Sequence, residues 1–130
     1  MAMTQMRSPL GRVLGLGSAK EGVEHWWRQR ITAIALVPLV LWFVIAVIHH
    51  VGADRAAMVA WMHEPIPAMM MILLIVATFY HAALGLQVVI EDYIHGEAMR
   101  LGALIVMRLL CILFVVRGIL AVLTLAFAAS

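Results

Sequence analysis

His81 has the clearest chemical potential in this chain of 130 residues, because it lies inside a long apolar run from Ile66 to Ile90. Ionisable side chains are rare in such runs, and the two ring nitrogens of a neutral imidazole still need partners there. The partner can be a hydrogen-bonding group on a neighbouring helix, a proton path or a bound metal, including a haem iron. The residue alone leaves both a packing role and a ligand role open.

The residues that share a helical face with His81 are mostly small. At 100° per residue, Ala77, Gly85, Val88 and Asp92 lie close to the face of His81. Small residues before and after the histidine leave space for a flat macrocycle or for the close approach of a second helix. The face is compatible with either arrangement.

A second polar group, Glu91, Asp92 and Tyr93, ends the same apolar run. Carboxylates at a helix C-terminus oppose the helix dipole, so they are not there for helix stability. A tyrosine at a membrane interface is commonly an anchor. The alternative is a phenol that donates a hydrogen bond to a ligand at the membrane edge, with Asp92 orienting it or relaying protons. A quinone headgroup fits, because its carbonyls accept hydrogen bonds and its reduction takes up protons.

Two arginines are candidates for electrostatic roles. Arg30 begins the first apolar run and is expected on the same membrane side as Asp92 and Tyr93. Its guanidinium can snorkel to lipid phosphates, and it can also hold a haem propionate or polarise a bound carbonyl. Arg117 lies deep along the third run, so it should face the helix bundle or a partner, because a lone arginine in lipid is costly.

No other histidine lies near enough to share an iron with His81. His49 and His50 follow the first apolar run, at a depth that differs from that of His81 by about 20 Å. We expect them to form a solvated helix end. If His81 binds haem, its opposite ligand must come from another chain, or the site is not bis-histidine. Methionine ligation stays open, because the chain has 10 methionines.

Three apolar runs must position these residues. The chain is 65% hydrophobic and 12% charged, with a mean hydropathy of +1.05, which is far outside the range of soluble domains. Each run approaches or exceeds the roughly 20 residues that a membrane-spanning helix needs, and isolated strands cannot satisfy their backbone in lipid. The sequence predicts an all-α integral membrane protein with one domain, residues 1–130. Its transmembrane helices are expected at about 31–50, 66–92 and 101–128, after a short cytoplasmic segment 1–30.

The distribution of Lys and Arg predicts the orientation. Five basic residues precede the first run, and Arg100 follows the second. The loop between the first two runs has only Arg55, beside Asp54 and Glu64. The positive-inside rule therefore places the N-terminus and the Glu91–Arg100 loop in the cytoplasm and the C-terminus in the periplasm.

Three further features give local expectations. The segment Ser18 to Arg30 can form an interfacial helix, with Ser18 as N-cap and Glu21 completing a capping box. Pro38 can kink the first span. Cys111 is the only cysteine, so the chain alone can form neither a disulfide framework nor a thiolate metal site, and we expect a small buried hydrophobe.

Two segments carry a resemblance to a known family. They are SAKEGVEHWWRQRITAIALVPL from Ser18 and HAALGLQVVIEDYIH from His81. The chain resembles the D-type hydrophobic membrane-anchor subunit of bacterial succinate dehydrogenase, the respiratory Complex II. The second segment is similar to the family's pattern on its second helix, in which a histidine, a glycine and an Asp-Tyr pair recur at these offsets.

The resemblance implies roles for four residues. His81 would be an axial ligand of haem b, with the other axial histidine supplied by the C-type anchor subunit. Tyr93, with Asp92 beside it, would contribute to the ubiquinone site at the interface with the iron–sulfur subunit. Arg30 would lie near the haem propionates and the quinone pocket.

The resemblance also implies the setting of the chain. FAD and iron–sulfur clusters would belong to partner subunits, where a flavoprotein oxidises succinate, and this chain alone would not be catalytic. The location would be the bacterial inner membrane. Membrane lipid would be a further partner, and no nucleic acid would be bound. Fumarate reductases are built alike, so the resemblance is compatible with either physiological direction, succinate oxidation or fumarate reduction. The alternative is a non-redox transport or assembly subunit in which His81 only packs, although few intramembrane polar residues are available for a transport path.

Overall fold

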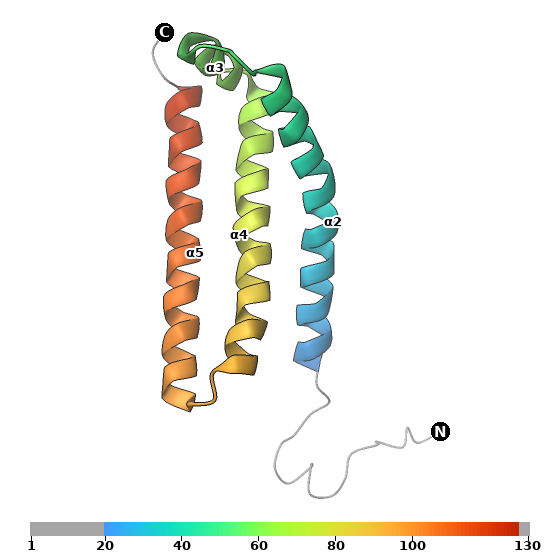
Figure 1. Ribbon diagram of the computed structural model, residues 1–130, viewed down its shortest axis with the longest axis vertical. Helices are drawn as coiled ribbons and strands as arrows, with labels where there is room; N and C mark the ends of the chain where they lie inside the picture. The colour runs from blue at the N-terminus through green and yellow to red at the C-terminus, as the bar shows by residue number, and fades with distance from the viewer. Residues whose placement is uncertain (1–19, 128–130) are drawn as a thin grey trace, which may run out of the picture.

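The computed structural model describes residues 20–127, with side chains from Gly22 onward. This part of the chain forms four helices and no strand: α2 (Lys20–His49), α3 (Arg55–Met62), α4 (Pro65–Tyr93) and α5 (Glu97–Ala126). In Figure 1, α4 lies between α2 and α5, and the short α3 crosses one end of the bundle. Both α2 and α5 pack on α4, and they do not pack on each other. The predicted all-α fold is confirmed.

Three helices are long and apolar enough to cross a membrane: Gly22–His49, Pro65–Tyr93 and Glu97–Ala126. At 1.5 Å per residue their 28 to 30 residues span about 42 to 45 Å, which exceeds the roughly 30 Å of a hydrocarbon core. Their ends therefore extend into the headgroup layers. The structure confirms the three predicted spans.

The first span begins earlier than predicted. The segment that we expected as a separate interfacial helix up to Arg30 continues without a break into α2, which starts at Lys20. The predicted cap at Ser18 and the side chain of Glu21 lie outside the described residues. Pro38 is inside α2, where it cannot donate a backbone hydrogen bond, and α2 is bowed in Figure 1.

The helix α3 was not predicted from the sequence. Asp54 caps it, with its Oδ1 accepting a hydrogen bond of 2.8 Å from the backbone N–H of Ala57. Gly52, with a φ of +83°, turns the chain before it. Met62 at the end of α3 is buried with Ala68 of α4 and Val122 of α5. This small core joins α3 to the ends of two spans.

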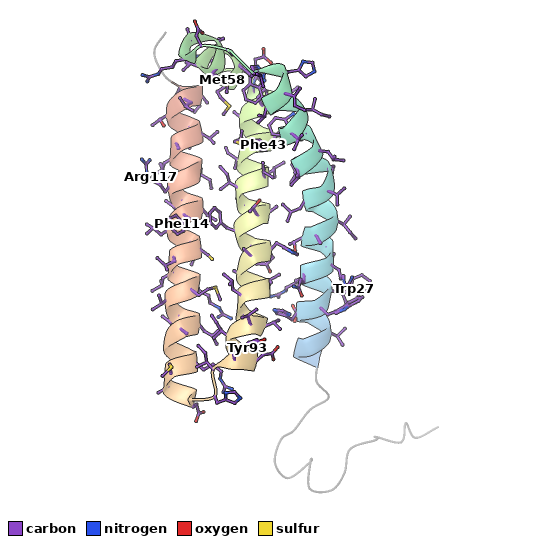
Figure 2. All side chains as sticks on the ribbon, in the orientation of Figure 1. Trp27, Phe43, Met58, Tyr93, Phe114 and Arg117 are labelled. Atoms are coloured by element: carbon purple, nitrogen blue, oxygen red, sulfur yellow. The ribbon has the colours of Figure 1, made fainter. Side chains whose placement is uncertain are left out.

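Most apolar side chains of the spans face outward (Figure 2). Only six of the described hydrophobic residues are buried: Ala46, Met62, Ala68, Leu84, Met107 and Val122. Among the described glycines, Gly118 of α5 has the tightest surroundings, because an added Cβ would lie 3.0 Å from Cγ2 of Ile75 on α4. Small residues permit such approaches between membrane helices. The outer faces are suited to lipid or to partner helices rather than to water.

Candidate functional site

His81 lies on α4 and is directed toward α2. Its side chain is half-buried, and its Nδ1 is 2.9 Å from Oγ1 of Thr32 on α2. The same hydroxyl lies 2.9 Å from the backbone oxygen of Arg28 and 3.0 Å from that of Gln29. The imidazole is therefore tied to the neighbouring helix through one nitrogen.

The other ring nitrogen, Nε2, remains available. No hydrogen bond within residues 20–127 reaches it, and it is not among the enclosed polar atoms that lack a partner. In this part of the chain, no three His, Cys, Asp or Glu side chains converge to form a metal site. His81 is therefore not part of a cluster of three or more such side chains among the described residues.

The small-residue face beside His81 is used for helix packing. One turn after His81, a Cβ added at Gly85 would lie 3.9 Å from Nε2 of Gln29 on α2. This is ordinary van der Waals contact, so the Gln29 side chain of α2 lies beside this turn of α4. Of the two uses left open by the sequence, the structure shows contact with a second helix, made here through a side chain.

The Asp-Tyr pair lies at the opposite end of α4 from α3. Tyr93 is 79% exposed, and Figure 2 shows it at the end of the helix near the α4–α5 connection. Asp92 is exposed as well. The neighbouring Glu91 accepts a hydrogen bond of 2.8 Å from Nε2 of Gln87, and Oε1 of Gln87 accepts one of 3.1 Å from Arg108 of α5. Tyr93 takes no part in this network.

Arg30 lies on α2 between Gln29 and Thr32, which contact α4 beside Gly85 and at His81, so it is nearer to the level of His81 than to that of Tyr93. Its guanidinium carbon is 5.0 Å from the centroid of the Trp26 ring, a cation–π contact on α2 itself. No hydrogen bond or ion pair within the described chain joins Arg30 to Asp92 or Tyr93. The described part of this chain therefore does not assemble the three residues into one pocket.

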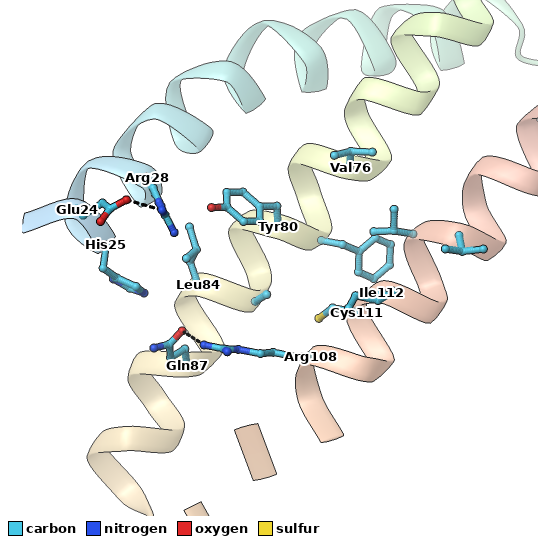
Figure 3. Close-up of a pocket in the computed structure, with 14 residues that line it drawn as sticks. Glu24, His25, Arg28, Val76, Tyr80, Leu84, Gln87, Arg108, Cys111 and Ile112 are labelled. Carbon is cyan, nitrogen blue, oxygen red and sulfur yellow. Dashed lines mark hydrogen bonds and ion pairs between the residues drawn. The ribbon is translucent and has the colours of Figure 1, made fainter. Parts of the chain in front are cut away.

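A groove that the sequence did not reveal lies between α2 and α5, with α4 as its floor (Figure 3). Its volume is about 710 Å³. Five polar residues gather toward one end of it: Glu24, His25, Arg28, Gln87 and Arg108. Apolar side chains line the rest, and neither His81 nor Tyr93 borders it. Three helices contribute to the groove, and the period of one helix cannot predict which of their faces meet.

Two other expectations can be compared with the structure. His49 is exposed, as expected, but a solvated end is wrong for His50, which is half-buried. Its ring centroid is 4.4 Å from that of Trp61, and its Nδ1 donates a hydrogen bond of 2.7 Å to the Ala46 oxygen. Arg117 is exposed on α5 (Figure 2). It does not face the bundle of this chain, which leaves a partner as the predicted contact.

Comparison with known proteins identifies the family. Residues 4–128 match the pattern of the succinate dehydrogenase/fumarate reductase transmembrane subunit. The succinate dehydrogenase hydrophobic membrane anchor subunit of Rickettsia bellii is 37% identical over 116 residues, which cover 89% of this chain and 93% of the relative. That of Rickettsia conorii is 34% identical over 106 residues, covering 81% and 84%.

A relative from another genus has the same name. The succinate dehydrogenase hydrophobic membrane anchor subunit of Paracoccus denitrificans is 34% identical over 82 residues, which cover 63% of this chain and 64% of the relative. No solved structure matches the chain. The family match spans nearly the whole sequence, including all three spanning helices. The chain therefore belongs to the family of succinate dehydrogenase membrane-anchor subunits.

Proposed function

We propose that this anchor subunit supplies His81 as one axial ligand of a haem b and helps to bind ubiquinone through Tyr93. The observation that carries the proposal is that only one of the two ring nitrogens of His81, on a spanning helix, has a hydrogen-bond partner among the described residues. Its Nδ1 is held by Thr32, while its Nε2 has no partner in the described structure. A ligating histidine is commonly held through its other ring nitrogen in this way.

The haem would be shared between two subunits. His81 is the one described histidine inside the middle of a span, and His50 is already bonded at the far end of α2. The opposite ligand would therefore come from the C-type anchor subunit. When bound, the haem would supply one-electron transfer. Arg30 pairs with no carboxylate among the described residues, so its charge would be available to a propionate or to the quinone.

The quinone contact would lie at the cytoplasmic edge. Tyr93 is twelve positions after His81 on the same helix, about 18 Å along its axis. Its exposed phenol would donate a hydrogen bond to a quinone carbonyl, with Asp92 beside it. The high exposure of Tyr93 is that expected of a site completed by another chain, here the iron–sulfur subunit. That subunit and the flavoprotein would hold the iron–sulfur clusters and FAD.

We place the start of α2 and the α4–α5 connection on the cytoplasmic side of a bacterial inner membrane. Figure 1 shows both at the same end of the bundle. The first halves of α2 and α5 begin at this end and contain four arginines, Arg28, Arg30, Arg100 and Arg108. Basic residues are enriched on the cytoplasmic side of membrane proteins. In a Cys111→Ala background, a membrane-impermeant maleimide should label Val51→Cys in intact spheroplasts and should label His95→Cys only after permeabilisation. The reverse pattern would exclude this orientation.

The competing function is a non-redox role in which His81 only packs. The hydrogen bond to Thr32 supports it, because a packing histidine would make the same contact. Isolation of the complex through a tag on this chain separates the two. We expect a flavoprotein, an iron–sulfur protein and a second hydrophobic chain to co-purify, with a b-type absorbance on reduction. A complex with those partners but without that absorbance would refute the haem proposal and leave only the anchor role.

A further inference from the structure

We infer that Thr32 positions His81, because its hydroxyl fixes the imidazole as the Nδ1–H tautomer and leaves Nε2 as the metal-binding atom. The part of this inference that concerns haem rests on the proposed function. Thr32 and His81 are 49 positions apart in the sequence and come from different spans. Their contact joins the first spanning helix directly to the candidate ligand.

The number of protons around the Thr32 hydroxyl determines the tautomer. Three groups surround Oγ1: the Arg28 oxygen at 2.9 Å, the Gln29 oxygen at 3.0 Å and His81 Nδ1 at 2.9 Å. Backbone oxygens can only accept, and the hydroxyl has one proton to donate. Donating it to the carbonyls of the preceding turn, as helical threonines commonly do, leaves Oγ1 an acceptor toward His81. Nδ1 must then carry the hydrogen, and Nε2 carries the lone pair.

The structure of α2 holds the Thr32 hydroxyl in a fixed position toward His81. Threonine is β-branched and stiff about χ1, and its bonds to two carbonyls of its own helix hold the hydroxyl in place. Beside Gly85, one turn along α4, the side chain of Gln29 reaches across from α2, with its Nε2 3.9 Å from where a Cβ would lie. The two helices are therefore in contact over the turn next to the bond between Thr32 and His81. Both side chains are half-buried, so water competes poorly for the bond.

The contact has a consequence for a bound haem. A hydrogen bond from Nδ1–H to an acceptor orients the ring and increases the basicity of Nε2 as a ligand. Loss of such a bond typically weakens metal binding by 10- to 100-fold. A less basic Nε2 loses more of its binding to ferric iron than of its binding to ferrous iron, so the reduction potential of the haem rises. A tenfold change in the ratio of the two affinities corresponds to about 59 mV for one electron.

The test compares hydroxyl variants in the assembled complex. Thr32→Val removes the hydroxyl at nearly constant volume. We expect it to raise the haem midpoint potential by about 59 mV, which corresponds to a tenfold change in the ratio of the ferric and ferrous affinities. It should also speed the loss of haem in detergent. Thr32→Ser keeps the hydroxyl and should stay near wild type. Redox titration followed at the b-type absorbance measures the potential, and dye-linked succinate oxidation reports on assembly.

Thr124 on α5 provides a matched control. Its hydroxyl also donates to its own helix, with Leu120 O at 2.9 Å and Ala121 O at 2.8 Å, and no hydrogen bond among the described residues joins it to a histidine. Thr124→Val thus removes the same kind of backbone bond away from His81, and the haem potential should not change. If the Thr32→Val complex does not assemble, Thr32→Ala is measured in its place. Failure of both variants alongside assembly of Thr32→Ser would assign the hydroxyl to folding and overturn the positioning role.

The inference and the proposed function fail in different ways. If Thr32→Val keeps the wild-type potential and haem retention while His81→Ala loses the haem, Thr32 does not position the ligand and the proposed function stands. If the wild-type complex has no b-type absorbance, both are overturned. A raised potential in Thr32→Val that also occurs in Thr124→Val would reject a specific effect on His81.

Discussion

Replacing His81 by alanine is expected to reduce the b-type absorbance of the purified complex to background. The physical reason is that alanine has no donor for the iron. His25 of α2 lies seven positions before Thr32, which contacts His81, so it is about 10 Å along the helix from that level. The half-buried His50 is held by Ala46 and Trp61 at the far end of α2, so it cannot substitute. The reduced-minus-oxidised difference spectrum of purified complex, scaled to flavin content, measures the effect.

His49→Ala is the appropriate control for this loss. His49 ends the first span and is exposed, so its removal deletes a membrane-edge imidazole without affecting the candidate site. The His49→Ala complex should keep the full absorbance. If His81→Ala keeps it as well, the ligand lies elsewhere, and the hydrogen bond with Thr32 is a packing contact.

The second large effect is expected from Tyr93→Phe, which removes one phenolic donor and keeps the aromatic ring. A hydrogen bond of this kind contributes about 0.5 to 1.5 kcal/mol, so kcat/KM for quinone reduction should fall roughly 2- to 12-fold. Succinate oxidation by a soluble dye should survive, because it does not need the membrane site. Parallel assays with ubiquinone and with the dye measure the two activities.

Tyr80 is a close control, because it is the only other tyrosine of the chain and lies on the same helix. It borders the groove between α2 and α5, away from the α4–α5 connection. Tyr80→Phe should leave quinone reduction unchanged. Equal losses of the quinone and dye activities in Tyr93→Phe would point to a defect in assembly and would contradict a contact with quinone.

The sequence predicts the spans well because in lipid the controlling quantities are length and hydropathy, which belong to each segment alone. The runs that begin at Ile31, Ile66 and Leu101 each start inside an observed spanning helix. The extent of α2 toward Lys20 is harder to predict, because the polar turns outside the hydrocarbon carry no hydropathy signal. A usable signal for α3 was present in Asp54, a good N-cap residue ahead of the helix formers Ala and Met.

Contacts between helices could not be predicted in the same way. In a soluble helix the apolar stripe shows which face packs inward, but here apolar residues cover nearly all faces of α2, α4 and α5. Nothing in the pattern therefore aligns Thr32 with His81 or His50 with Trp61. His81 itself could be found because it is a rare polar residue in an apolar run. Thr32 carries a weaker form of the same signal, as a lone hydroxyl near the start of the first run.

The central claim is that this chain contributes one half of a shared haem site. The most direct measurement is the haem b content of the wild-type complex per copy of this chain, beside that of the chain purified alone. We predict one haem b per copy in the complex and none in the isolated chain. A complex that reduces quinone without b-type haem, or an isolated chain that is stably loaded with haem, would contradict the account.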